Sequence, residues 1–89
     1  MNAASRELLR QNLLVQLNAV TPAALRVPAL QVGAMAGGFD VLQAELAGEL
    51  AYLADKKLVS TVEKPVSPEN KHWRITADGR DYLAELGLA

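Results

Sequence analysis

The sequence contains no cysteine and only one histidine, His72. Without cysteine the chain has neither disulfides nor thiolate metal ligands, and one histidine with scattered carboxylates does not supply the three or four protein ligands of a metal site. The serines have no base partner other than His72, and no G-x-S-x-G turn surrounds them, so the arrangement needed for nucleophilic catalysis is missing. We therefore expect a protein that is not an enzyme and that has no metal site and no cofactor.

Long apolar runs and a surplus of charge of one sign are also missing. No uncharged stretch reaches the roughly 20 apolar residues that a membrane span requires. The first residues lack the basic start and the apolar run of a signal peptide, so we expect a cytoplasmic protein without a membrane segment. Nine basic and ten acidic side chains give a net charge of −1, which argues against attraction to nucleic acid over the whole surface. Any such attraction must come from a local patch.

The residues that are abundant favour helices. Hydrophobic residues make up 51% of the chain but aromatic residues only 4%, so the core must consist mainly of Leu, Val and Ala. A chain of 89 residues is long enough for one hydrophobic core and too short for two. We therefore expect one domain over residues 1–89.

Two rows of leucines predict the longer helices. Ser5 is the expected N-cap of the first helix, which should end near residues 18–20 before Pro22. Asp40 is the expected N-cap of the third helix, with Gln43 completing a capping-box-like pair, and this helix should extend to Lys57. The first row consists of Leu9, Leu13 and Leu17, and the second of Leu42, Leu46, Leu50 and Leu53.

The segment between these helices has a mixed pattern. Residues 25–27 alternate like a short strand, Pro28 is suited to the start of a helix, and residues 30–36 predict a short second helix. Gly37-Gly38 then provides a stop.

After Lys57 the apolar period changes to two, which predicts a β-hairpin. Residues 58–63 form the first predicted strand, residues 65–70 a polar turn, and residues 72–75 a second strand with Trp73 and Ile75 on one face. Trp73 is interpreted as a core residue under the hairpin, in preference to a platform for a ligand. Thr76 is the expected N-cap of a last helix over residues 77–86, which Gly87 ends.

Two local runs resemble a known family. Residues 50–59, LAYLADKKLV, resemble the L-x-x-L-x-x-x-G-L-V join between recognition helix and wing in bacterial regulators of the PadR, MarR and ArsR types. Residues 73–80, WRITADGR, are similar to the Y-x-L-T-x-x-G that closes the wing in PadR-like and MarR-like proteins. The resemblance implies an α+β, mainly α, winged helix-turn-helix fold with a three-helix core, a β-hairpin wing and a C-terminal helix. Lys57 departs from the pattern, because the family prefers Gly there.

The resemblance also implies a dimeric, DNA-binding transcriptional regulator whose third helix enters the major groove. Residues 40–55, however, contain four acidic residues and no Lys or Arg, so only Gln43 is suited to reading a base. The positive charges lie around the predicted wing, where they contact DNA phosphates or form an ordinary solvated surface. The candidate DNA-binding residues are Gln43, Lys56, Lys57, Lys64, Lys71, His72 and Arg74.

The outward face of the third helix supports an alternative partner. Its small residues form either a plain surface of helix-favouring alanines or a smooth face for close contact with a protein. Gly48 costs about 1 kcal/mol relative to Ala inside a helix, which favours the contact interpretation. A winged-helix protein-interaction module that does not bind DNA is therefore the alternative function. The small size without an effector domain is similar to compact winged-helix proteins of phages and prophages. The candidate protein-contact residues are Ala44, Ala47, Gly48 and Ala51.

Overall fold

The computed structural model describes residues 2–62 and 71–89. This part of the chain is mainly helical, with four α-helices and a small antiparallel sheet, so the predicted α+β, mainly α, class is confirmed. In chain order the elements are α1 (Ala3–Val20), β1 (Leu25–Arg26), α2 (Val27–Ala36), α3 (Gln43–Asp55), β2 (Val59–Val62), β3 (His72–Ile75) and α4 (Ala77–Glu85).

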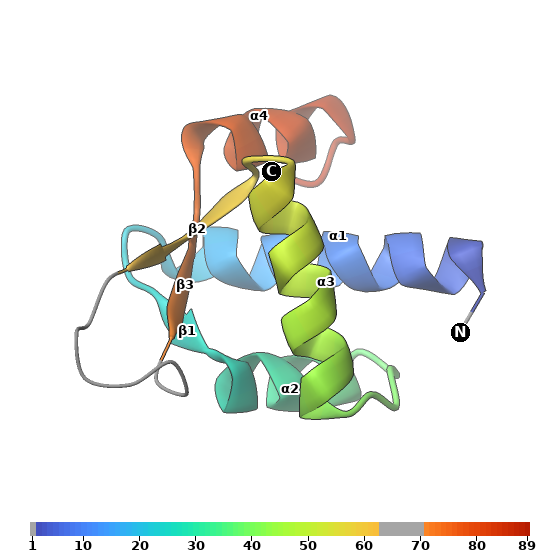
Figure 1. Cartoon of the computed structure of the whole chain (residues 1–89). Helices are drawn as coiled ribbons and strands as arrows, with labels where there is room; N and C mark the ends of the chain where they lie inside the picture. Colours follow the sequence, from blue (N-terminus) through green and yellow to red (C-terminus); the bar gives the residue numbers. More distant parts are fainter. Residues whose placement is uncertain (1, 63–70) are drawn as a thin grey trace.

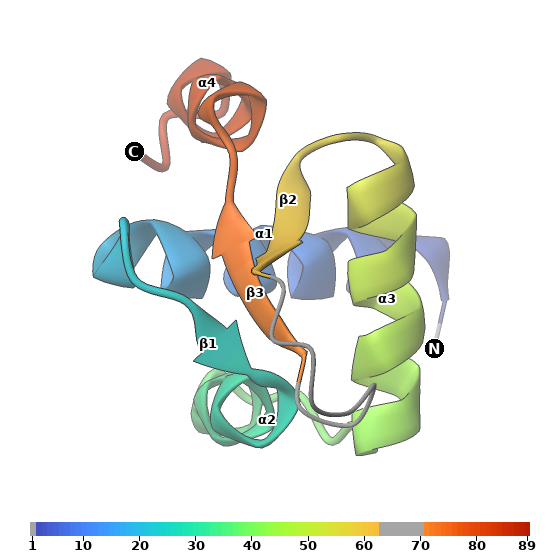
Figure 2. The ribbon, with the colours of Figure 1, turned by 60° about the vertical axis from the view of Figure 1, so that its left-hand side comes forward.

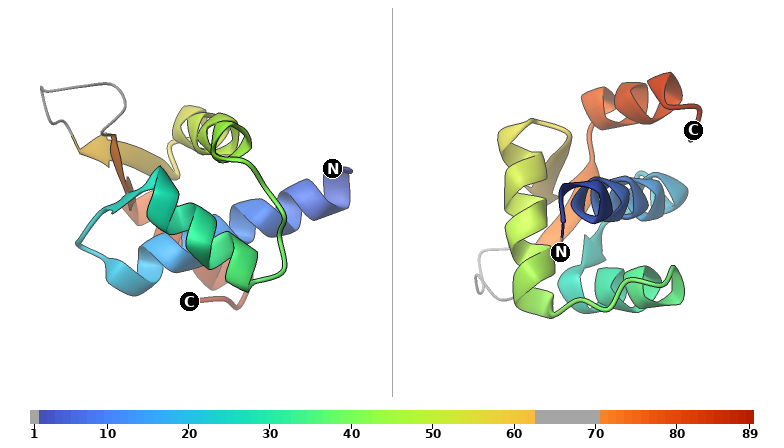
Figure 3. Two further views of the ribbon diagram at one scale, coloured as in Figure 1. Left: turned by 90° about the horizontal axis from the view of Figure 1, so that it is seen from below. Right: turned by 90° about the vertical axis from the view of Figure 1, so that its right-hand side faces the viewer.

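The helices surround α1, which runs through the middle of the molecule. Seen nearly along α1, the right panel of Figure 3 shows α2, α3 and α4 on three of its sides. The sheet covers one end of this arrangement, beside α3 (Figures 1 and 2). Its strand order is β1-β3-β2 and both pairs are antiparallel, with Trp73 opposite Leu25 on one side and Thr61 on the other. The predicted pairing of the two strands after α3 is thus confirmed.

Helix α1 begins earlier than the sequence predicted. Asn2, in an extended conformation, is the N-cap, and its side-chain oxygen accepts a hydrogen bond from the Ser5 N–H at 2.8 Å. The prediction of Ser5 as the cap was therefore wrong, because Asn2 already satisfies the free N–H of the first turn. The predicted end is confirmed, since α1 stops at Val20.

Helix α2 directly follows the two-residue strand β1. It starts at Val27, three residues before the predicted start, with Pro28 in its first turn. Gly38 has a φ of 93°, and the Phe39 N–H donates to the Ala34 carbonyl oxygen at 3.0 Å. This is the hydrogen bond of a Schellman motif, so the predicted stop at the glycine pair is confirmed.

Helix α3 starts later than predicted. Its N-cap is Leu42, whose backbone N–H donates to the Glu45 carboxylate at 3.0 Å, so the predicted pair of Asp40 and Gln43 was wrong. Val41 is only 3% exposed and its carbonyl accepts a hydrogen bond from Gln31, which holds residues 41–42 outside the helix. Leu42 is consequently 68% exposed and is not a core residue. The other three leucines of the row, Leu46, Leu50 and Leu53, are buried as predicted.

The end of α3 is a second Schellman motif, and it contains no glycine. The helix stops at Asp55, two residues before the predicted end. Lys57 adopts a φ of 64°, and the Leu58 N–H donates to the Leu53 carbonyl oxygen at 3.0 Å. The Thr76 hydroxyl donates to the Lys57 carbonyl at 2.7 Å, which ties this turn to the start of α4. Lys57 therefore takes the left-handed conformation in which glycine is favoured.

The last strand and α4 follow the predicted pattern. Trp73 and Ile75 are 6% and 0% exposed and belong to the core, which confirms their common face. The Thr76 side chain accepts from the Gly79 N–H at 3.0 Å, which confirms the predicted N-cap. Gly79 is buried against the carbonyl of Leu58, so α4 packs closely on the turn after α3.

Candidate functional site

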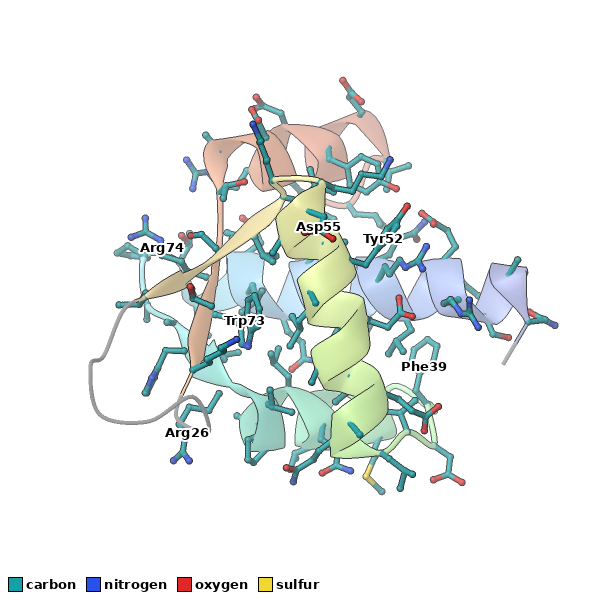
Figure 4. The ribbon with its side chains drawn as sticks, in the orientation of Figure 1. Arg26, Phe39, Tyr52, Asp55, Trp73 and Arg74 are labelled. Carbon is teal, nitrogen blue, oxygen red and sulfur yellow. The ribbon has the colours of Figure 1, made fainter. Side chains whose placement is uncertain are left out.

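A groove of about 400 Å³ lies between α3 and β3. Figure 4 shows Trp73 between the sheet and α3, at the side of this groove. One wall is the flank of α3 that turns toward the sheet, and the other is formed by the start of α2 and by β3 with the residue before it. The residues lining this α3–β3 groove are Val27, Gln43, Ala44, Ala47, Ala51, Lys71 and Trp73.

Glu45, in the first turn of α3, and Glu49, near its middle, lie on the opposite flank, toward α1. Glu49 accepts a hydrogen bond from the Arg10 guanidinium, and the Arg6 guanidinium lies 3.8 Å from its other carboxylate oxygen. Glu45 lines a hollow there together with Arg6, Leu9 and Glu49. With 3.6 residues per turn, positions 45 and 49 fall on one side of the buried leucines, and positions 43, 47 and 51 fall on the other. Among the residues that the structure describes, none of those lining the α3–β3 groove is acidic.

Gln43 is the polar side chain that α3 contributes to the groove. Its amide nitrogen donates to the Gln31 side-chain oxygen at 3.1 Å. The Gln31 amide nitrogen donates in turn to the Val41 carbonyl at 2.9 Å. Gln43 is exposed, yet its position is constrained by α2 and by the segment before α3.

Trp73 forms the deep part of the groove wall. Its side chain belongs to the core, which agrees with the structural role expected from the sequence. Its Nε1–H is the one buried side-chain nitrogen or oxygen in residues 2–62 and 71–89 that has no hydrogen-bond partner. A buried donor without an acceptor destabilises the folded state, so the indole is held there by its apolar contacts.

The candidate basic residues do not all lie at the groove. Lys71 is exposed and lines it. His72 and Arg74 alternate with Trp73 along β3, so they project from the other face of the sheet. In Figure 4, Arg74 lies on the side of the sheet away from α3. Lys64 lies outside the described residues.

Lys56 and Lys57 belong to a different region, at the C-terminal end of α3. There a second hollow of about 320 Å³ is bordered by residues of α1, α3 and α4. The Arg10 guanidinium lies 3.9 Å from the centre of the Tyr52 ring, and the Lys56 ammonium lies 5.8 Å from it. The Tyr82 hydroxyl donates to the Glu7 carboxylate at 2.8 Å, and this bond, with burial, raises the pKa of Tyr82.

Sequence reasoning missed this second cluster. Its members Glu7, Arg10, Tyr52 and Tyr82 come from three helices, and no local spacing connects them. The hydrogen bond and the stacked guanidinium occupy the polar groups of the cluster with one another. The cluster therefore connects α1, α3 and α4 with one another.

The four candidate protein-contact residues of α3 are exposed in the structure. Ala44, Ala47 and Ala51 line the α3–β3 groove, whereas Gly48 does not. A Cβ atom added to Gly48 would meet no atom within 4 Å. Internal packing therefore does not explain a glycine at this position.

In the described residues no group of three or more His, Asp or Glu side chains is placed to hold a metal ion. None of the described helices is long and apolar enough to cross a membrane. No protein family, curated protein or solved structure matches this chain.

Proposed function

We propose that the chain is a winged helix-turn-helix protein that binds double-stranded DNA with its α3–β3 groove facing the duplex. In this assignment α3 is the recognition helix, and β2 with β3 forms the wing. The order of helices and strands, the strand order β1-β3-β2 and the two sequence runs that resemble winged-helix regulators support it.

The observation that carries the proposal is the separation of charge across α3. A helix that enters the major groove passes between two phosphate backbones, so carboxylates on its exposed flank would repel the duplex. Glu49 is paired with arginines of α1, and Glu45 lies on the same flank. The flank toward the wing carries no charge and faces Lys71 across the groove. This arrangement keeps Glu45 and Glu49 away from the α3–β3 groove.

The outer face of the sheet offers further basic side chains. Arg26 on β1 is paired in register with His72, and Arg74 is the next outward residue on β3. His72 and Arg74 belong to the wing strand β3 and Arg26 to the neighbouring strand β1, and contacts from a wing to phosphates orient a protein on DNA without reading its sequence. Regulation of transcription by a dimer, which the resemblance implies, is part of the proposal. The mass of the protein in solution, with and without DNA, tests whether it is a dimer.

Binding to random duplex DNA over a series of salt concentrations tests the proposal. We expect an affinity that falls steeply with salt, because bound cations are released from the phosphates. Lys71→Ala should weaken binding and reduce the slope of log K against log salt by about 1. Arg80→Ala is the matched control, since Arg80 is exposed on α4, away from the groove. Absence of binding at low salt, or an equal effect of both substitutions, contradicts the proposal.

A protein partner is the second candidate, and the exposed face around Gly48 favours it. The open space where its Cβ would lie lets another backbone approach α3 closely. A photo-crosslinking residue placed at Ala47 should then form one defined protein adduct in cells. The same residue at Ala84, which is exposed on α4, is the control and should not. An adduct at Ala47 combined with no DNA binding would replace the first candidate by the second.

A further inference from the structure

We infer that Gln31 orients the side chain of Gln43 so that Gln43 recognises an adenine in the major groove. The inference rests on the proposed DNA binding and adds the base that is read and the residue that positions the reader. Gln31 lies on α2 and touches no base itself, so it is a positioning residue.

Two hydrogen bonds fix the orientation of the Gln31 side-chain amide. A backbone carbonyl only accepts, so the bond of 2.9 Å to Val41 requires the nitrogen end of the Gln31 amide. The oxygen end of Gln31 then faces Gln43 and accepts from its amide nitrogen at 3.1 Å. The Val41 carbonyl thereby fixes which end of each amide points where.

The Gln43 side chain keeps hydrogen-bonding groups that Gln31 does not use. Its amide nitrogen has two N–H groups, and one of them is used by Gln31. One N–H and the side-chain oxygen are left for a partner in the groove. If the Gln43 amide were rotated by half a turn, two oxygen atoms would face each other and the bond would be lost. The free donor and the free acceptor therefore keep a defined order.

The remaining N–H and oxygen of Gln43 match the major-groove edge of adenine. Adenine presents the N7 acceptor and the N6 amino donor in the major groove, which pair with the N–H and the oxygen of one glutamine. Guanine presents two acceptors, N7 and O6, so its O6 would face the oxygen of Gln43. No Arg or Lys lies on α3 to compensate with a bond to guanine. An A·T pair is thus the base pair that this helix can select.

The position of Gln43 agrees with such a role. It is the first residue of α3, and recognition helices contact base edges with their N-terminal residues. It shares the groove with Lys71, so a duplex bound to the wing lies within reach of both. Because Gln31 already restricts the side chain, less rotamer freedom is lost when the base binds.

Selection from a random duplex library, followed by chemical substitution, tests the inference. The duplexes enriched by the wild-type protein should share an adenine, and 7-deazaadenine at that position, which lacks the N7 acceptor, should weaken binding about tenfold. Gln43→Ala should bind the two duplexes equally. Gln31→Met should keep binding to random DNA and lose most of the preference for the natural adenine. Gln11→Ala, on α1, is the control and should keep the full preference.

A second variant covers the event that Gln31→Met does not fold. Gln43 is exposed, so Gln43→Glu should fold. The added carboxylate should weaken binding to all duplexes, and selection with this variant should replace the adenine by cytosine, whose N4 amino group donates to a carboxylate. Enrichment without an adenine, or an equal loss with 7-deazaadenine in the wild type and in Gln43→Ala, overturns the inference and leaves DNA binding intact. Absence of any binding to random duplexes overturns both proposals.

Discussion

Replacing Gly79 by Ala tests the close contact between α4 and the turn after α3. A Cβ atom at this position would lie 2.2 Å from the Leu58 carbonyl oxygen and 2.6 Å from Cγ1 of Ile75. The first distance is about 1.2 Å short of the 3.4 Å at which ordinary contact begins. The Leu58 oxygen cannot move freely, because it accepts a hydrogen bond from the Thr76 N–H at 3.1 Å. The substitution must therefore push α4 away from this turn or break that bond.

The size of the effect follows from two opposing contributions. Overpacking of a rigid site costs about 3 kcal/mol, the upper part of the usual range, since the obstacle is backbone. Replacing a helical glycine by alanine returns about 1 kcal/mol. We therefore expect Gly79→Ala to lower the free energy of unfolding by about 2 kcal/mol.

Gly48→Ala is the matched control for this prediction. It makes the same chemical change inside a helix, but the added Cβ atom meets nothing within 4 Å. This variant should gain about 1 kcal/mol, so the thermal midpoints of the two variants should differ by more than roughly 10 °C. Chemical and thermal unfolding followed by circular dichroism measures both. A Gly79→Ala protein as stable as the wild type would refute the packing of α4 described above.

Further substitutions test individual features of the structure. Lys57→Gly should raise the free energy of unfolding by about 1 kcal/mol, because glycine adopts the positive φ without steric cost. Leu42→Ser should also raise it by about 1 kcal/mol, because serine adds the missing side-chain cap of α3. An unchanged unfolding midpoint would contradict either prediction. The hydrogen bond to Glu7 raises the pKa of Tyr82. In a Tyr52→Phe protein, which leaves Tyr82 as the one tyrosine, the tyrosinate absorbance should therefore appear at a higher pH than for an ordinary tyrosine. Adding Glu7→Gln should lower the pH at which it appears. The stability that this hydrogen bond contributes to the folded state is present below the unfolded pKa of 10.0 and is lost as pH rises through the pKa of the folded state. A titration of Tyr82 that Glu7→Gln does not change would contradict this prediction.

The elements of this fold were largely predictable because their signals are local. The leucine rows, the alternation around Trp73 and the Thr76 cap each lie within a few residues, and the structure contains the corresponding elements. The errors concern boundaries that a distant contact decides. Asp40 is a better N-cap by residue type than Leu42, but Val41 is buried and its carbonyl is bound by Gln31 from α2. No pattern within residues 38–45 contains that information.

The candidate site was predictable only in part. Gln43 and Lys71 were expected from residue type, and the structure places them in one groove. The separation of Arg74 from that groove follows from strand alternation, but it required knowing which face of β3 is buried. The sequence around Gln31 did not indicate its contact with Gln43, because that contact depends on two hydrogen bonds to residues ten and twelve positions away.

Two pairs of charged residues explain how an acidic helix can present an uncharged flank. Arg6 and Arg10 are four residues apart on α1, as are Glu45 and Glu49 on α3, and such spacing places each pair on one face of its helix. The hydrogen bond from Arg10 to Glu49, with the Arg6 guanidinium 3.8 Å from the same carboxylate, fixes the flank of α3 that faces α1. The buried leucines fix the adjacent side, so Gln43 and the alanines must face the sheet. The contact that orients α3 in the core thus also determines which of its side chains line the α3–β3 groove, the surface proposed to face a duplex.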